Sequence, residues 1–135
     1  MKRVFGAFIA AIVCGTSGGC GSDVDRYELT GSITHNGQPI PAGTISFDPD
    51  ASRGNRGPGG YAIIENGRFQ TTSAHGTVGG PHIARVRGHD GIPVKLESGD
   101  TFEQGRPLFR EHKIRVELPR TSAEFDMDVK VPGRS

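Results

Sequence analysis

The sequence predicts an all-β fold, a single antiparallel β-sandwich of about seven short strands. The 135 residues include 21 glycines and 9 prolines, which are residues that helix interiors disfavour. Apolar and polar residues alternate along several short segments, which is the two-residue period of a strand with one buried face. Turn residues separate these segments, and this punctuation is typical of a sandwich.

The N-terminus predicts export. Lys2 and Arg3 precede an apolar run over residues 4–13, and the small or polar residues 15–19 lead to Cys20. This is the layout of a secretory signal peptide. The apolar run is about ten residues long, short of the roughly 20 that a membrane-spanning helix needs. We therefore assign residues 1–19 to a signal peptide and residues 20–26 to a tether.

Cys20 is a candidate lipidation site. The glycines directly before it resemble the lipobox of bacterial lipoproteins, in which the cysteine thiol is diacylated and becomes the first residue, although Ser17 stands where that pattern has a leucine or similar residue. Cys14 fits less well because a valine precedes it. The alternative is a signal-peptidase cut near Gly19 that leaves Cys20 as a free thiol. We expect a lipid-anchored protein of the cell membrane or outer membrane that faces the periplasm or the surface.

Cleavage before Cys20 would leave 116 residues with one cysteine, so no disulfide could form within the mature chain. Stability would then come from an ordinary core, which a chain of this size can bury. The removed segment holds two of the 16 basic residues and none of the 15 acidic ones, which leaves a net charge of −1. This balance gives no sign of a nucleic-acid partner.

The first strands are expected around residues 27–33 and 44–48. In the first, Tyr27, Leu29 and Ile33 would point inward, and Asn36-Gly37 is a tight-turn signal. In the second, Ile45 and Phe47 would point inward. Residues 48–60 have no apolar periodicity and are predicted to be an exposed loop. Residues 61–72 then predict a β-hairpin that turns at Asn66-Gly67.

The next strand is expected to begin at Pro81, because proline suits the first position of a strand. His82, Ala84 and Val86 would share one face, and Ile83, Arg85 and Arg87 the other, with the two arginines in water. Residues 88–91 would form the exit turn, and residues 89–109 a second long loop.

The last two alternating segments are expected to form an antiparallel pair. Inward residues would be Ile114, Val116 and Leu118 in one, and Phe125, Met127, Val129 and Val131 in the other. Lys113 and Arg115 would then face Asp126 and Asp128, at about 0.2–1 kcal/mol per charge pair. The sandwich domain is assigned to residues 27–132 and a tail to 133–135.

One family resemblance covers roughly residues 1–132. The stretch YELTGSITHNGQPIPAGTISFDPD resembles the opening of carboxypeptidase regulatory-like and transthyretin-like β-sandwich domains, and ENGRFQTT and GTVGGPHIARVRG resemble their later hairpin and strand. The whole chain is similar to small bacterial lipoproteins that carry one such domain. The resemblance implies a Greek-key, prealbumin-like sandwich and a location in the cell envelope. It implies no activity, because none is established for that family.

Hydroxyisourate hydrolases share the transthyretin-like fold and end in Tyr-Arg-Gly-Ser. This chain ends Pro132-Gly133-Arg134-Ser135, without the tyrosine and in a different order. The hydrolase motif is therefore missing. The shared fold does not by itself imply hydrolase activity, because fold alone does not confer function.

No local motif assigns catalysis, a cofactor or a metal. The five histidines lack metal-ligand spacing and are expected to be scattered on the surface: His35, His75, His82, His89 and His112. Asp48, Asp50 and Asp90 would supply calcium ligands only if their loops met, and they form no calcium-binding loop motif.

Two functional classes stay open. The first is a non-catalytic, tethered module with a structural or a protein- or carbohydrate-binding role, with contacts at edge strands and at the loops 48–60 and 89–109. The second is a hydrolase or metal-dependent binder whose site would gather His82, His89 and Asp90. The sequence predicts the first.

Overall fold

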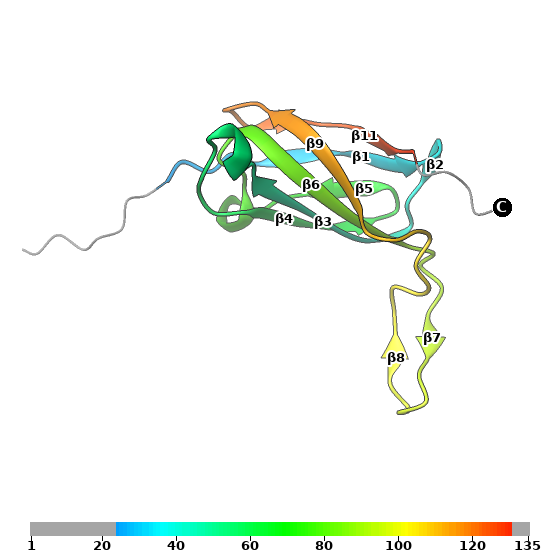
Figure 1. The fold of residues 1–135 in the computed structure, drawn as a ribbon. Helices are drawn as coiled ribbons and strands as arrows, with labels where there is room; N and C mark the ends of the chain where they lie inside the picture. The colour runs from blue at the N-terminus through cyan, green and yellow to red at the C-terminus, as the bar shows by residue number, and fades with distance from the viewer. Residues whose placement is uncertain (1–23, 131–135) are drawn as a thin grey trace, which may run out of the picture.

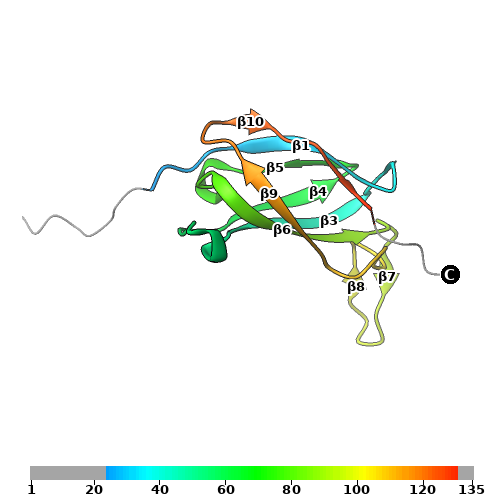
Figure 2. The same cartoon turned by 45° about the horizontal axis from the view of Figure 1, so that its top comes forward.

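The computed structural model describes residues 24–130, which form an all-β domain (Figure 1). Within these residues one nine-stranded sheet curls into a half-barrel. A separate two-stranded ribbon of β7 (Val94–Lys95) and β8 (Thr101–Phe102) projects from one end of it. The curl, seen from a second direction in Figure 2, lets a single sheet enclose the core.

The main sheet has the order β10-β1-β5-β4-β3-β6-β9, and β2 and β11 also pair with β1. Its strands are β1 (Leu29–His35), β2 (Gln38–Pro39), β3 (Ala42–Pro49), β4 (Gly60–Glu65), β5 (Arg68–Gln70), β6 (Gly80–His89), β9 (His112–Leu118), β10 (Ala123–Glu124) and β11 (Met127–Val129). Two single turns of 3-10 helix, η1 (Ala51–Arg53) and η2 (Ser73–His75), lie in the connections.

Both Asn-Gly turns form as the sequence predicts. Asn36 and Gly37 have φ values of 49° and 84°, and Asn66 and Gly67 have 50° and 75°. These positive φ values are those of the tight turn that suits the twist of a hairpin. The first turn joins β1 to β2, and the second joins β4 to β5.

The core follows the predicted alternation. Leu29 and Ile33 of β1, Ile45 and Phe47 of β3, and Val86 of β6 are fully buried. Strand bounds differ modestly from the prediction: β1 begins at Leu29, with Tyr27 half-buried before it, and β6 continues to His89, so it includes the first two residues of the predicted exit turn.

The predicted antiparallel pair at the C-terminus is wrong. β9 pairs antiparallel with β6, whereas β10 and β11 pair parallel with β1 at the far end of the sheet order. Lys113 and Arg115 therefore do not lie on a strand next to Asp126 and Asp128. Residues 119–122 carry the chain from one end of the curled sheet to the other. β9 and β10 are therefore close in sequence but do not pair with each other.

The two aspartates bind β1 instead. Ser32 N donates to Asp126 Oδ1 at 2.8 Å. Thr34 Oγ1 and Gly37 N donate to Asp128 Oδ1 at 2.6 and 3.0 Å. These hydrogen bonds lower the pKa values of both aspartates. Those from Ser32 favour the ionised form of Asp126, and those from Thr34 and then Gly37 favour the ionised form of Asp128.

A glycine in β1 permits this close approach. A Cβ atom on Gly31 would lie 1.9 Å from the carbonyl oxygen of Phe125. Phe125 N donates to the carbonyl of Thr30 at 2.7 Å, so the backbone of the C-terminal segment runs directly against β1. A side chain at this position would push the segment away.

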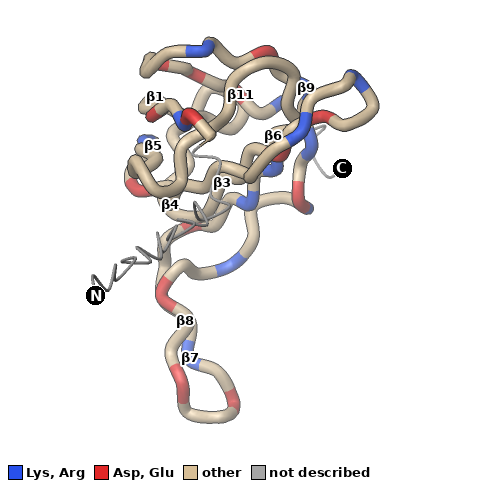
Figure 3. The backbone as a smooth tube through the Cα atoms, turned by 90° about the vertical axis from the view of Figure 1, so that its left-hand side faces the viewer, with Lys and Arg blue, Asp and Glu red and all other residues tan. Residues whose placement is uncertain are grey.

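The two predicted loops differ in structure. Residues 48–60 begin as the end of β3, pass through η1 and reach β4, and Asp50 within them is only 2% exposed. Residues 89–109 contain the β7–β8 ribbon, which was not predicted. We call residues 90–107 the arm, because they stand away from the body of the domain (Figure 3).

Candidate functional site

The lipidation site predicted at Cys20 lies outside the described residues, as do the signal peptide, most of the tether and the tail. Across the described range of 24–130, no helix is both long and apolar enough to cross a bilayer.

His82 is not a surface residue. Its side chain is fully buried, on the predicted face with Ala84 and Val86. Nδ1 lies 3.0 Å from the carbonyl oxygen of Gly80, and because a carbonyl only accepts, Nδ1 carries the proton. Nε2 is then a buried acceptor, and it has no hydrogen-bond partner. The sequence predicted the direction of this side chain but not its complete enclosure.

His89 and Asp90 lie at the other end of β6 and hold the base of the arm. Asp90 Oδ1 accepts hydrogen bonds from Ile92 N at 2.9 Å and from Arg106 N at 3.1 Å. The His89 ring packs edge-on against Phe102 with centroids 5.5 Å apart. His82 and His89 are separated by about 23 Å along the strand. The structure therefore does not bring His82, His89 and Asp90 together.

The aspartates considered for calcium also have other partners. Asp50 Oδ1 accepts from Ser52 N at 3.1 Å and from Ser52 Oγ at 2.5 Å, and these bonds lower its pKa, with Arg115 and Arg53 adding positive charge nearby. Asp48 forms an ion pair with Arg85 at 2.9 Å. In residues 24–130 no group of three or more His, Cys, Asp or Glu side chains is placed to hold a metal ion.

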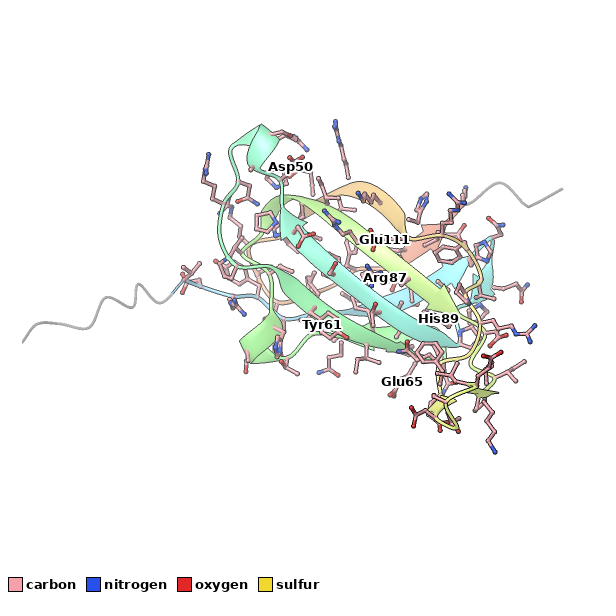
Figure 4. All side chains as sticks on the ribbon, turned by 60° about the horizontal axis from the view of Figure 1, so that its bottom comes forward. Asp50, Tyr61, Glu65, Arg87, His89 and Glu111 are labelled. Carbon is pink, nitrogen blue, oxygen red and sulfur yellow. The ribbon has the colours of Figure 1, made fainter. Side chains whose placement is uncertain are left out.

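The outer face of the sheet carries a groove of about 680 Å³ over β4, β5 and β1. We call it the outer groove. Two of its lining residues, Tyr61 and Glu65, are labelled in Figure 4. Its lining residues are Thr30, Tyr61, Ala62, Ile63, Glu65, Arg68, Phe69, Gln70, Thr72 and His75.

Strand register explains the shape of the outer groove. Ile64 pairs with Phe69, which places Ile63 beside Gln70 on the outer face. Thr30 pairs with Gln70 from the other side. Tyr61 and Ile63 form an apolar ridge along β4 and are 43% and 53% exposed. The short Thr30 opposite this ridge leaves the space between them open.

Polar side chains close the two ends of the outer groove. Glu65 and Arg68 are cross-strand partners at the hairpin end. At the other end the His75 ring meets the Tyr61 ring edge-on at 6.4 Å, and Thr72 Oγ1 lies 3.0 Å from His75 Nδ1. An apolar wall between hydrogen-bonding ends is the usual composition of a ligand site.

Sequence reasoning missed the outer groove although a signal was present. A hairpin with one face in water should carry polar residues on that face, and Tyr61 and Ile63 break this rule at successive outward positions. An exposed aromatic beside an exposed aliphatic residue was the sign of a binding face.

The remaining part of the outer face is a charged network on β3, β6 and the segment before β9. Glu111 Oε2 accepts from Arg87 Nε at 2.7 Å, and its Oε1 lies 3.7 Å from Arg85 NH1. The Arg87 hydrogen bond lowers the pKa of Glu111, and the charges of Arg87 and Arg85 act in the same direction. Figure 4 shows Arg87 and Glu111 together on this face. These charges largely neutralise each other.

The chain matches no family model, no curated protein and no solved structure.

Proposed function

We propose that the chain is a non-catalytic, lipid-anchored β-sandwich module of the cell envelope that binds a saccharide in the outer groove. The single observation that carries the binding role is the ridge of Tyr61 and Ile63 on the outer face of a rigid sheet. The anchor rests on the sequence before and at Cys20.

The chemistry of the outer groove fits a sugar ring. A pyranose has an apolar face of C–H groups and a rim of hydroxyls. The Tyr61 ring and Ile63 offer apolar surface for the face, and the planar ends of Glu65, Arg68 and Gln70 offer donors and acceptors for the rim. Tyrosine supplies this surface at a low cost in conformational entropy.

We propose further that the fold is the Greek-key, transthyretin-like sandwich that the sequence resembles. The order β6-β3-β4-β5 supports it, because a strand that returns by a longer connection to lie beside the first of three sequential strands is the arrangement of a Greek key. The long connection is the segment from residue 71 to residue 79.

Calorimetric titration with short neutral and N-acetylated oligosaccharides tests the binding role. We expect one or more of them to bind, and Tyr61→Ala to weaken the affinity about tenfold or more, which corresponds to about 1.4 kcal/mol. Amide resonances of β4 and β5 should shift when the sugar binds.

Phe102→Ala is the matched control, because Phe102 is 40% exposed against 43% for Tyr61 and lies on the arm outside the groove. It should leave sugar affinity unchanged. Absence of binding to every sugar, or equal affinity of the Tyr61→Ala variant and the wild type, would refute the proposal. Binding of extended peptides alone would replace the saccharide with a protein ligand.

A further inference from the structure

The arm is an exposed structure with little support of its own. β7 and β8 pair only through Val94 with Phe102 and Lys95 with Thr101. Two-stranded ribbons are marginally stable in water unless something covers them. Ile92, Leu96 and Phe102 on the arm are 66%, 47% and 40% exposed. A projecting ribbon with this much apolar surface is typical of a docking element.

The base of the arm is nevertheless well fixed. The Asp90 carboxylate accepts hydrogen bonds from the backbone N–H groups of Ile92 and Arg106. In the backbone, Asp90 N donates to the carbonyl of Arg106 at 2.9 Å, and Gly91 N donates to the carbonyl of Gln104 at 2.8 Å. The arm is thus held in one direction from the body, away from the sheet, as Figures 1 and 3 show. Holding it in this direction reduces the entropy lost on docking.

The tip of the arm is acidic by one charge, because Glu97 and Asp100 outweigh Lys95 of β7, and Glu103 follows β8 toward the base. Glu97 and Asp100 lie in the tip turn, which is closed by the bond from Leu96 N to the carbonyl of Asp100 at 2.7 Å. Arg106 and Arg110 lie at the base and are exposed. The carboxylate of Asp90 at the base is already engaged by two backbone N–H groups.

A hollow of about 480 Å³ lies beside the base of the arm. We call it the base hollow. It is lined by Arg87, Gly88, His89, Pro107, Leu108, Phe109, Arg110 and Glu111. Leu108, which is 39% exposed, makes it partly apolar, and Arg110 gives it a basic rim, whereas Glu111 is paired with Arg87. Its chemistry complements an arm tip that carries Leu96 and two carboxylates.

We propose that the occupant is the arm of a second copy of this chain. Two copies related by a two-fold axis, with their arms antiparallel, place each acidic tip at the other copy's basic base and form both contacts at once. A two-fold interface is self-complementary in this way. Parallel arms would instead oppose acidic tips to each other. The antiparallel arrangement is thus the one that the charge distribution favours, and it covers both ribbons.

Sedimentation equilibrium of the full chain across a concentration series tests this proposal. We expect a reversible dimer for the wild type. Glu97→Lys/Asp100→Lys should raise the dissociation constant at least about tenfold, because each base then meets a tip of like charge. Arg106→Glu/Arg110→Glu should do the same for the opposite reason.

The deciding measurement is a mixture of these two variants. In a mixed pair, the positive tip of one chain meets the negative base of the other, and the negative tip of the second meets the positive base of the first. The mixture should therefore dimerise although neither variant does alone. Loss of dimer through misfolding would not be repaired by mixing.

Arg56→Glu/Lys130→Glu changes the net charge by the same amount as the base variant, at exposed sites outside the arm and the base hollow, and should remain dimeric. A wild type that stays monomeric at all concentrations, variants that dimerise like the wild type, or a mixture that stays monomeric would each overturn the proposal. The oligosaccharide titration is independent of this test, because the outer groove lies on other strands.

Discussion

His82 is a fully buried polar side chain near the start of β6, and Asn55 Nδ2 lies 3.5 Å from its Nδ1. Its Nδ1 proton is bonded to Gly80, and its Nε2 lone pair is desolvated without compensation. Packing around the imidazole must therefore offset the cost of this unsatisfied acceptor. At the opposite end of the same strand His89 is half-buried and packs on the arm. The two histidines of β6 thus have different structural roles.

Replacing His82 with alanine should destabilise the domain by about 2–4 kcal/mol, because it leaves a cavity in the core. This exceeds the modest effect expected of a residue at a strand entrance. His75→Ala, at an exposed residue, should change the free energy of unfolding by no more than about 0.5 kcal/mol. Urea denaturation of the two variants and the wild type measures the difference. Equal stability of the two variants would contradict this account.

At the scale of elements, local and long-range pairings differ in how far the sequence predicts them. The Asn66-Gly67 hairpin was predictable because its turn conformation is specified by two adjacent residues. The parallel pairing of β11 with β1 was not, because Met127 pairs with Ile33, far away in sequence. Alternation fixes which face a residue occupies but leaves the neighbouring strand open. Outward charges such as Lys113 and Asp126 were therefore assigned to the wrong partners.

Attachment of the C-terminal segment to β1 should weaken in acid. The pKa values of Asp126 and Asp128 lie below their usual 3.8 in the folded state, so their stabilisation is present above that value and is lost as the pH falls through the folded pKa. We expect the free energy of unfolding to decrease as the pH is lowered beyond about 4.

The double variant Asp126→Asn/Asp128→Asn should be less stable at pH 7 and lose less stability between neutral and acidic pH. Denaturant titrations at several pH values measure both effects. Asp50 and Glu111 should maintain part of the acid dependence, because their pKa values are also lowered. Asp100→Asn, which removes a carboxylate from the arm and none from β1, is the control. A double variant with the full wild-type pH dependence would be evidence against this attachment.

At the scale of the whole molecule, the chain enters the domain at the end opposite the arm (Figures 1 and 2). Val24 is four positions after Cys20, so a lipid on Cys20 would hold the start of the domain within about 14 Å of the bilayer surface. The arm would then project from the end of the domain opposite the attachment of the lipid. The class of fold was predictable from composition, whereas the arm was not, because its glycines and prolines are equally typical of an irregular loop.

Mass spectrometry of the protein recovered from its host membrane tests the anchor. We expect a mature chain that begins at Cys20 and carries the added mass of a diacylglyceryl group. Cys20→Ser should release the chain from the membrane fraction or block its processing. A chain that begins at or after Cys20 without lipid would remove the anchor from the proposed function.

The pairing of β1 with β10 and β11 has a consequence for how the domain is made. Ser32 and Asp126, which bond to each other, are 94 positions apart. Such distant contacts require the closure of a long loop before they contribute stability, and they slow folding. β1 therefore cannot complete its pairing until residues 123–129 have been synthesised. If the N-terminus directs export as the sequence predicts, this late closure would leave the sheet incomplete while the chain crosses the membrane.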